Sequence, residues 1–265
     1  MKTIVWHLKD EITWLVFWIL GMGAYIGLVV FIYPEFGDTF ESMMFNIPIV
    51  KLFMGQFAPD LMNSSPWDAF LGMEFFAWFG ILAGFFPLIF ASETIAGEME
   101  KGMMDMLLAQ PISRSRVLLA KFTAIAILLA VLCVACFTIL VAAVALYLPQ
   151  SPSIYGYAST FLNGYLLLLV IAALGFLCSS LTDSQRASLS VSITVVILSY
   201  IFYEGLSAFK IAPWFTRLMP FHYANPIKTL ASRQIDWWDN LILTVMMAIC
   251  LSLALVVFQR KDIAA

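Results

Sequence analysis

Long apolar stretches alternate with polar connections along this chain of 265 residues. Six of them stand out, near residues 12–33, 69–92, 119–148, 159–182, 187–206 and 240–258. Roughly 20 apolar residues in a helix cross the hydrocarbon core of a bilayer, so each stretch can span a membrane. The pattern predicts an all-α membrane protein in which residues 1–265 form a single domain of six transmembrane helices.

A mixed segment precedes the first span. Residues 1–11 carry Trp6 and other apolar side chains among Lys2, Lys9 and Asp10. The mixture predicts a short interfacial helix that leads into the span, with a frayed terminus as the alternative. The span exceeds the apolar region of a signal peptide and no Ala-x-Ala cleavage site follows it, so we interpret it as a retained helix.

Two connections, residues 34–68 and 207–238, are long and apolar. Both are interrupted by prolines, namely Pro48, Pro59, Pro66, Pro213, Pro220 and Pro226. Irregular backbone at membrane depth needs surrounding protein to satisfy its polar groups. We therefore expect both connections, including residues 207–238 before the sixth span, to lie in the outer interface or to re-enter the membrane in part.

The distribution of lysine and arginine predicts the orientation. Nine of them fall on the side of the two termini, and five are spread over the long loops of the other side. By the positive-inside rule, both termini are then cytoplasmic. We expect a multi-pass protein of a plasma or inner membrane, from a prokaryotic cell.

Composition excludes several classes of function. The chain is 62% hydrophobic and 12% charged, far from the soluble range, and its net charge of −3 with no basic tract argues against nucleic acid. Cys133 and Cys136 form a C-x-x-C inside an apolar span, which we interpret as two small core residues. An intramembrane enzyme would need a nucleophile with a base or a metal cluster. The sequence has no G-x-S-x-G, no H-E-x-x-H and no histidine in any span, so we expect no catalytic residue and no metal site.

The segment Glu93–Lys121 is the polar exception between the second and third spans. Its eight charged residues are Glu93, Glu98, Glu100, Lys101, Asp105, Arg114, Arg116 and Lys121. Each would cost about 3 kcal/mol at mid-bilayer, so the segment stays outside the membrane. A helical wheel places Glu98, Lys101, Gly102, Asp105 and Ala109 on one face of a helix that ends before Pro111. Lys101 can pair there with Glu98 or with Asp105. Ser113 is then a candidate N-cap for the third span.

Such a helix could rest on lipid headgroups or in a protein groove. Its acids would meet an anionic inner leaflet unfavourably. A mixed-charge face beside a methionine-rich face suits a protein partner better.

Three parts of the sequence resemble type-2 ABC exporter permeases. The run from Glu98 to Lys121 is similar to the family's first cytoplasmic loop. Met219–Tyr223 resembles its outer Ser-Pro-Phe turn, with Met219 in place of serine, and Phe258–Ile263 resembles its closing Phe-x-Arg-Arg-Asp-Ile tail, with Lys261 in place of an arginine. The six-span plan covers the whole chain.

The resemblance implies a permease that pairs with a second permease and with two separate ATPase subunits. It implies that the Glu98–Gln110 helix is a coupling helix seated in a groove of the ATPase, with Glu98, Glu100, Lys101, Gly102, Asp105, Pro111, Arg114 and Arg116 as candidate residues. It also makes the turn at Asp183, Ser184 and Gln185 a second, smaller docking point. The sequence has no G-x-x-x-x-G-K-[ST], so ATP and Mg are expected on the partner and no cofactor on this chain.

Four residues are candidates for a translocation path. Glu74 lies well inside the second span, where a carboxylate must face protein or water; it could instead be bonded to a neighbouring span for packing. Ser188, Ser192 and Ser199 form a stripe on the fifth span, for which close helix packing is the blander explanation. A secondary transporter or channel that uses Glu74 for ion coupling is the alternative function, although such carriers usually contain internal repeats. The substrate cannot be inferred from the sequence.

Overall fold

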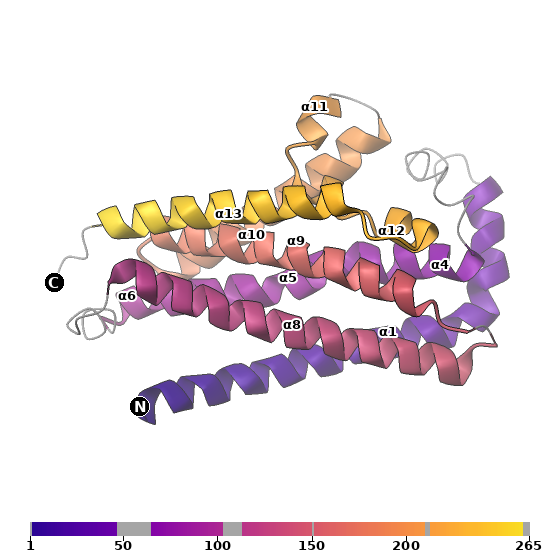
Figure 1. Ribbon diagram of the computed structural model, residues 1–265, viewed down its shortest axis with the longest axis horizontal. Helices are drawn as coiled ribbons and strands as arrows, with labels where there is room; N and C mark the ends of the chain where they lie inside the picture. Colours follow the sequence, from indigo (N-terminus) through magenta and orange to yellow (C-terminus); the bar gives the residue numbers. More distant parts are fainter. Residues whose placement is uncertain (1, 47–64, 103–112, 150, 210–212, 262–265) are drawn as a thin grey trace. The chain divides into compact units, whose positions relative to one another are not determined.

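An apolar chain in a bilayer must satisfy its backbone polar groups internally, and helices do so within one segment. The computed structural model describes residues 2–46, 65–102, 113–149, 151–209 and 213–261. Within these ranges all regular structure is helical and no strand occurs (Figure 1). The predicted all-α class is confirmed.

Six helical stretches in the described residues are long and apolar enough to cross a membrane. They are Ile12–Phe36, Pro66–Glu100, Arg114–Tyr147, Ile154–Leu181, Gln185–Ala208 and Trp237–Arg260. The first belongs to α1 (Lys2–Asn46), and the last four are α8 (Arg114–Tyr147), α9 (Ile154–Leu181), α10 (Gln185–Ala208) and α13 (Trp237–Arg260). Each overlaps one predicted span, so the six-span prediction is confirmed.

The second span is not one uniform α-helix. It runs through α4 (Pro66–Leu71), the π-helix η1 (Gly72–Phe76), α5 (Ala77–Ala91), the π-helix η2 (Ser92–Gly97) and the short α6 (Glu98–Glu100). π-Helical turns are uncommon inside α-helices and are frequent at functional sites. Glu74 lies in the first of these turns, and the second leads directly into the charged segment.

Helix α1 extends beyond the predicted first span at both ends. Residues 2–11 are helical and continuous with the span, while their place in the membrane interface stays a prediction. The helix also passes through Pro34 to Asn46, so it continues beyond the first span, which is Ile12–Phe36 in the structure and near 12–33 in the prediction. A proline inside a helix removes one backbone hydrogen bond but does not oblige a membrane helix to stop.

Short helices fill the connection between α10 and α13. They are α11 (Pro213–Thr216), the 3₁₀-helix η3 (Pro220–His222) and α12 (Pro226–Ser232). Each begins at a proline, whose fixed φ suits the first helical position and whose missing N–H is not needed there. Partial re-entry of this connection into the membrane stays a prediction.

The described chain packs as two compact units. Unit 1 comprises Met1–Trp78, Ala130–Leu162 and Pro226–Ile235, and unit 2 comprises Phe79–Leu129, Asn163–Asn225 and Asp236–Ala265. That both act as one permease domain stays a prediction.

Unit 1 is organised around buried aromatic and hydroxyl side chains. Trp67 Nε1 donates to the Tyr157 hydroxyl at 2.8 Å, and both side chains are almost fully buried. Helix α12 lies beside α4 (Figure 1). The hydroxyl of Thr229 in α12 is 3.0 Å from that of Thr160 in α9. A Cβ at Gly72 would come within 3.0 Å of Ile227, so glycine permits this close approach.

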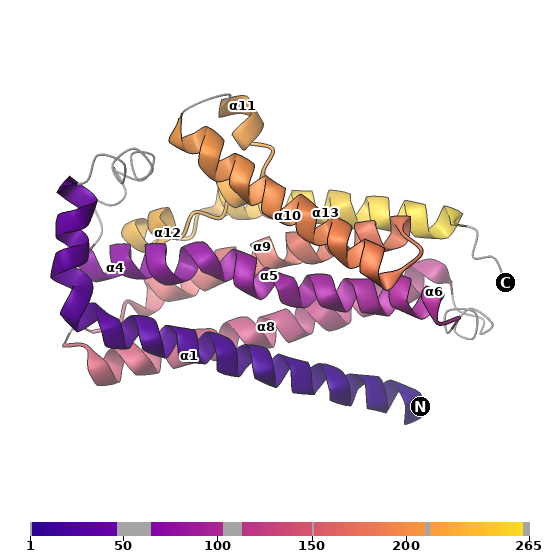
Figure 2. The same ribbon diagram turned by 180° about the vertical axis from the view of Figure 1, so that it is seen from behind.

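Unit 2 packs around Phe176 of α9. Its ring centroid lies 6.5 Å from that of Phe90 and 5.8 Å from that of Phe122. Helix α10 packs against η2, and Figure 2 shows it crossing this end of the second span. Small residues again allow the approach, because a Cβ at Gly97 would lie 3.1 Å from Gln185 Oε1.

Candidate functional site

The charged segment begins with a helix that ends sooner than predicted. α6 stops at Glu100, and Lys101 and Gly102 form a turn in which Gly102 has a φ of 66°. Left-handed backbone of this kind favours glycine and commonly ends helices. The single helix predicted from Glu98 to Gln110 is therefore wrong at its first turn. Asp105 and Pro111 lie outside the described residues.

Glu98 forms an ion pair with Lys121 of α8, at 2.5 Å between Oε2 and Nζ. Only 14% of the Glu98 side chain and 16% of the Lys121 side chain are exposed. Lys121 also donates to the backbone carbonyl of Thr94 in η2. The sequence predicted Lys101 as the partner of Glu98, but Lys101 is exposed and the cation at Glu98 comes from the third span.

Glu100 joins the two predicted docking elements. Its carboxylate accepts a hydrogen bond from the backbone N–H of Gln185 at 2.9 Å. Gln185 is the first residue of α10, so the carboxylate lies at the positive end of that helix, where an anion is favoured. Ser184 is the N-cap of the same helix and accepts from Ala187 N at 3.3 Å. The connection between the fourth and fifth spans is short, since α9 ends at Leu181 and α10 begins at Gln185, and its docking role stays a prediction.

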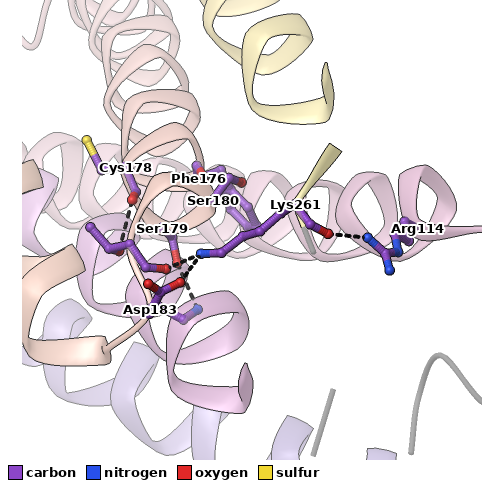
Figure 3. Close-up of polar contacts among 9 residues, drawn as sticks. Arg114, Phe176, Cys178, Ser179, Ser180, Asp183 and Lys261 are labelled. Carbon is purple, nitrogen blue, oxygen red and sulfur yellow. Dashed lines mark hydrogen bonds and ion pairs between the residues drawn. The ribbon is translucent and has the colours of Figure 1, made fainter. Parts of the chain in front are cut away.

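The ends of three more helices meet in the same region of unit 2. Ser179 Oγ of α9 accepts from Ala96 N of η2 at 2.9 Å. Lys261, directly after α13, donates from Nζ to the Thr182 carbonyl at 2.5 Å and contacts Asp183 Oδ1 at 2.7 Å. The Lys261 carbonyl accepts from Arg114 Nη1 at 2.6 Å (Figure 3).

These contacts define what we call the helix-end cluster. Its members are Thr94, Ala96, Glu98, Glu100, Arg114, Lys121, Ser179, Thr182, Asp183, Gln185 and Lys261. The Lys261 ammonium, hydrogen-bonded to Asp183, holds the pKa of that carboxyl below its ordinary 3.8. The cluster links the ends of spans two to six.

The sequence agrees with a family of known transporters. A family model described as ABC-2 family transporter protein matches residues 8–263. The chain belongs to this family. No curated protein matches it. As an ABC-2 permease, the chain is the membrane component of an ABC transporter, a multi-pass protein rather than the ATP-binding subunit.

Two further predictions concern the start of α8 in this ABC-2 permease. The helix begins at Arg114, directly after Ser113 as predicted, and the Ser113 carbonyl accepts from Arg116 N and Val117 N, while a cap by the Ser113 side chain stays a prediction. Arg116 is exposed. Of the two arginines predicted at the site, the cluster includes Arg114.

Several cluster members were not singled out from the sequence as site residues. Thr94, Ala96 and Thr182 contribute backbone groups, and Ser179 is a neutral side chain inside an apolar span. Lys261 was visible as part of the closing tail, and Lys121 as the end of the charged segment. Because charged residues are rare in this chain, the charge of Lys121 and Lys261 could have identified them as candidate site residues.

The candidate path residues fall in both units. In unit 1, the backbone carbonyl of Glu74 accepts from the Tyr25 hydroxyl, and its side chain is half-buried. In unit 2, Ser188 and Ser192 are buried on α10, and Ser192 Oγ donates to the Ser188 carbonyl at 2.7 Å. Ser199 Oγ lies 3.2 Å from Met219 Sδ. Burial of Ser188 and Ser192 fits the packing explanation, and a role in a path stays a prediction.

Proposed function

We propose that this ABC-2 permease couples ATP hydrolysis by a separate subunit to export of a substrate, through the segment Glu98–Lys121. The ATPase binds this segment at the exposed Lys101 and Gly102 and at Asp105, and it also binds the turn at Asp183–Gln185. The observation that carries the proposal is the hydrogen bond from Gln185 N to Glu100, because it joins both predicted docking elements within the permease.

The polar contacts support a mechanical coupling. Nucleotide-dependent closure of the ATPase acts on the segment and on the turn together. Glu98 and Lys121 carry the displacement to the second and third spans, and Lys261 and Arg114 carry it to the fourth and sixth. Coupling of this kind requires that the ATPase bind the two arrangements of the permease with different free energies.

The proposal includes the partners and the orientation. Two ATPase subunits bind ATP and Mg, and a second permease copy or paralogue completes the transporter. The termini and the charged segment lie in the cytoplasm, in agreement with the lysine and arginine distribution. Glu74, Ser188, Ser192 and Ser199 are the candidates for contact with the substrate.

A pull-down tests the proposed docking surface. Tagged full-length permease, isolated from its native membrane, is expected to bring down an ATP-hydrolysing protein. Lys101→Glu and Asp105→Lys are expected to lose that protein, because they reverse charges on the docking surface. Glu35→Lys reverses an exposed charge on α1 and serves as the matched control.

Two results would overturn the proposal. One is equal recovery of the ATPase with all three variants. The other is reaction of a cysteine at position 101 with an impermeant thiol reagent added outside intact cells, because the segment would then lie on the wrong side of the membrane.

A further inference from the structure

In unit 2, Lys261 connects the first residue of α8 to the residues that follow α9. Arg114, the first residue of α8, donates to the Lys261 carbonyl at 2.6 Å. The Lys261 side chain in turn donates to the Thr182 carbonyl at 2.5 Å and contacts Asp183 at 2.7 Å (Figure 3). We call these four residues the clip.

The clip satisfies backbone groups that a helix leaves unpaired. The last carbonyls of a helix have no partner within it and attract cations. Thr182 follows the last residue of α9, and Lys261 follows the last residue of α13. Lys261 therefore caps the end of α9, while Arg114 caps the end of α13.

The clip and the contact between Glu100 and Gln185 both reach the turn between α9 and α10. Within the charged segment, Glu100 is the last residue of α6 and Arg114 is the first residue of α8. Glu100 binds the first residue of α10 directly. Arg114 reaches the Thr182–Asp183 part of the same turn through Lys261. The charged segment is thus attached at two points to the turn between the fourth and fifth spans.

We infer that Lys261 is a positioning residue that makes the charged segment and this turn move as one body. The inference rests on the proposed function, since both elements are its docking points. Without Lys261, the segment keeps its attachment through Glu100 but loses the one through Arg114. The turn can then lag behind the segment when the ATPase closes.

Burial indicates which contact of Lys261 matters more. The Lys261 side chain is 16% exposed, whereas that of Asp183 is 90% exposed, and exposed ion pairs contribute little. The Thr182 carbonyl is therefore the main anchor. Replacement of Lys261 by methionine is expected to open the clip, and replacement of Asp183 by asparagine is expected to leave it closed.

The first experiment measures the clip in the permease without its ATPase. Spin labels are placed at Leu119 of α8 and Ala187 of α10, which are exposed and outside the cluster, after replacement of the four cysteines. Full-length protein is reconstituted in vesicles of phosphatidylethanolamine and phosphatidylglycerol. We expect a narrow distance distribution that broadens with Lys261→Met and is restored with Lys261→Arg.

Arg260→Met is the matched control, because it removes a neighbouring positive charge at the end of the same helix. It is expected to leave the distribution narrow. Equal widths for Lys261→Met and the unsubstituted protein would overturn the clip, and so would equal broadening by Arg260→Met.

The second experiment uses the permease in complex with its ATP-hydrolysing partner. Addition of nucleotide is expected to shift the labelled distance. With Lys261→Met, binding of the partner and ATP hydrolysis persist while the shift is lost. A residue with a merely structural role would lose all three together.

The two experiments separate the inference from the proposed function. If no ATPase associates, the proposed function fails while the width measurement still decides on the clip. If the ATPase binds and nucleotide changes the labelled distance equally in Lys261→Met and in the unsubstituted protein, the positioning role of Lys261 fails while the proposed function stands.

Discussion

The two units use polar contacts in different ways. In unit 1 they include neutral hydrogen bonds between buried side chains, such as Trp67 with Tyr157 and Thr160 with Thr229, beside a longer ion pair of 3.4 Å between Asp68 and the exposed Arg233. In unit 2 the helix-end cluster consists largely of charged groups bound to one another or to backbone groups where helices begin and end. Neutral buried contacts fix packing. Charged contacts at helix ends can be rearranged by a partner that offers competing charges.

The comparison separates stability from coupling. Loss of a buried contact in unit 1 removes packing that nothing else replaces. Loss of a contact in the helix-end cluster leaves spans intact but detached at one end. Variants of unit 1 are thus expected to unfold the protein, and variants of the cluster to change how its helices move together.

The largest effect is expected from unit 1. Trp67 is 2% exposed, so Trp67→Ala should lower the free energy of unfolding by about 3–5 kcal/mol. Trp78 is 47% exposed, and Trp78→Ala should have a much smaller effect. Unfolding by SDS in mixed micelles, followed by circular dichroism, measures both. Equal losses would contradict the assignment of Trp67 to the core.

The ion pair of Glu98 and Lys121 should give a smaller effect. Lys121→Met leaves a largely buried carboxylate without its cation and should cost about 1–3 kcal/mol, less than for a fully buried pair. Adding Glu98→Gln should recover part of the loss. Lys101→Met, at an exposed position, should change the same unfolding free energy by less than about 0.5 kcal/mol. A cost with Lys101→Met equal to that of Lys121→Met would argue against the assigned pairing.

Gly102 and Gly205 provide a matched pair for the end of α6. A Cβ at either position meets nothing within 4 Å, but only Gly102 has a positive φ. Gly102→Ala should destabilise the protein by about 1–2 kcal/mol, because left-handed backbone is costly for alanine. Gly205→Ala, inside α10, should stabilise it by about 0.5–1 kcal/mol. Changes of the same sign in thermal unfolding would disprove the helix end at Glu100.

The smallest effect is expected from the pH dependence of the ion pair between the exposed Asp183 and Lys261. The folded pKa of Asp183 lies below its ordinary 3.8 because Lys261 donates to it. Its contribution to stability is therefore complete above the ordinary pKa and is lost as the pH falls through the lowered one. The distance between labels at Leu119 and Ala187 should not change across the neutral range. A transition there that Asp183→Asn removes would refute this pKa shift.

The spans could be predicted because membrane crossing requires only length and apolarity. The full length of α1 could not be predicted in this way, because the helix continues through Pro34 beyond the apolar stretch. The predicted extent of the helix that starts at Glu98 was wrong. Gly102 was placed on a helical wheel, although a glycine after the last polar turn is a recognised signal for a helix end.

The site was predictable only in part. Glu98 and Glu100 attract notice because acids are rare in this chain, and their position between two spans indicates a surface role. The partner of Glu100 could not be predicted, since Gln185 acts through its backbone N–H, and the same holds for the backbone carbonyls of Thr94 and Thr182 that accept from Lys121 and Lys261. The reach of Lys261 to the turn depends on the path of α13, which the sequence does not encode locally.

The two π-helical turns make the second span sensitive to its residue count. A π turn holds about one residue more than an α turn, so it rotates everything after it by about 100° around the axis. Three consecutive residues of η2, Ile95, Ala96 and Gly97, are buried in this wide turn. Deleting one residue there would aim Glu98 and Glu100 in a new direction without altering either side chain. The direction in which these two acids point around the helix axis thus depends on the number of residues in η2 as well as on the acids themselves.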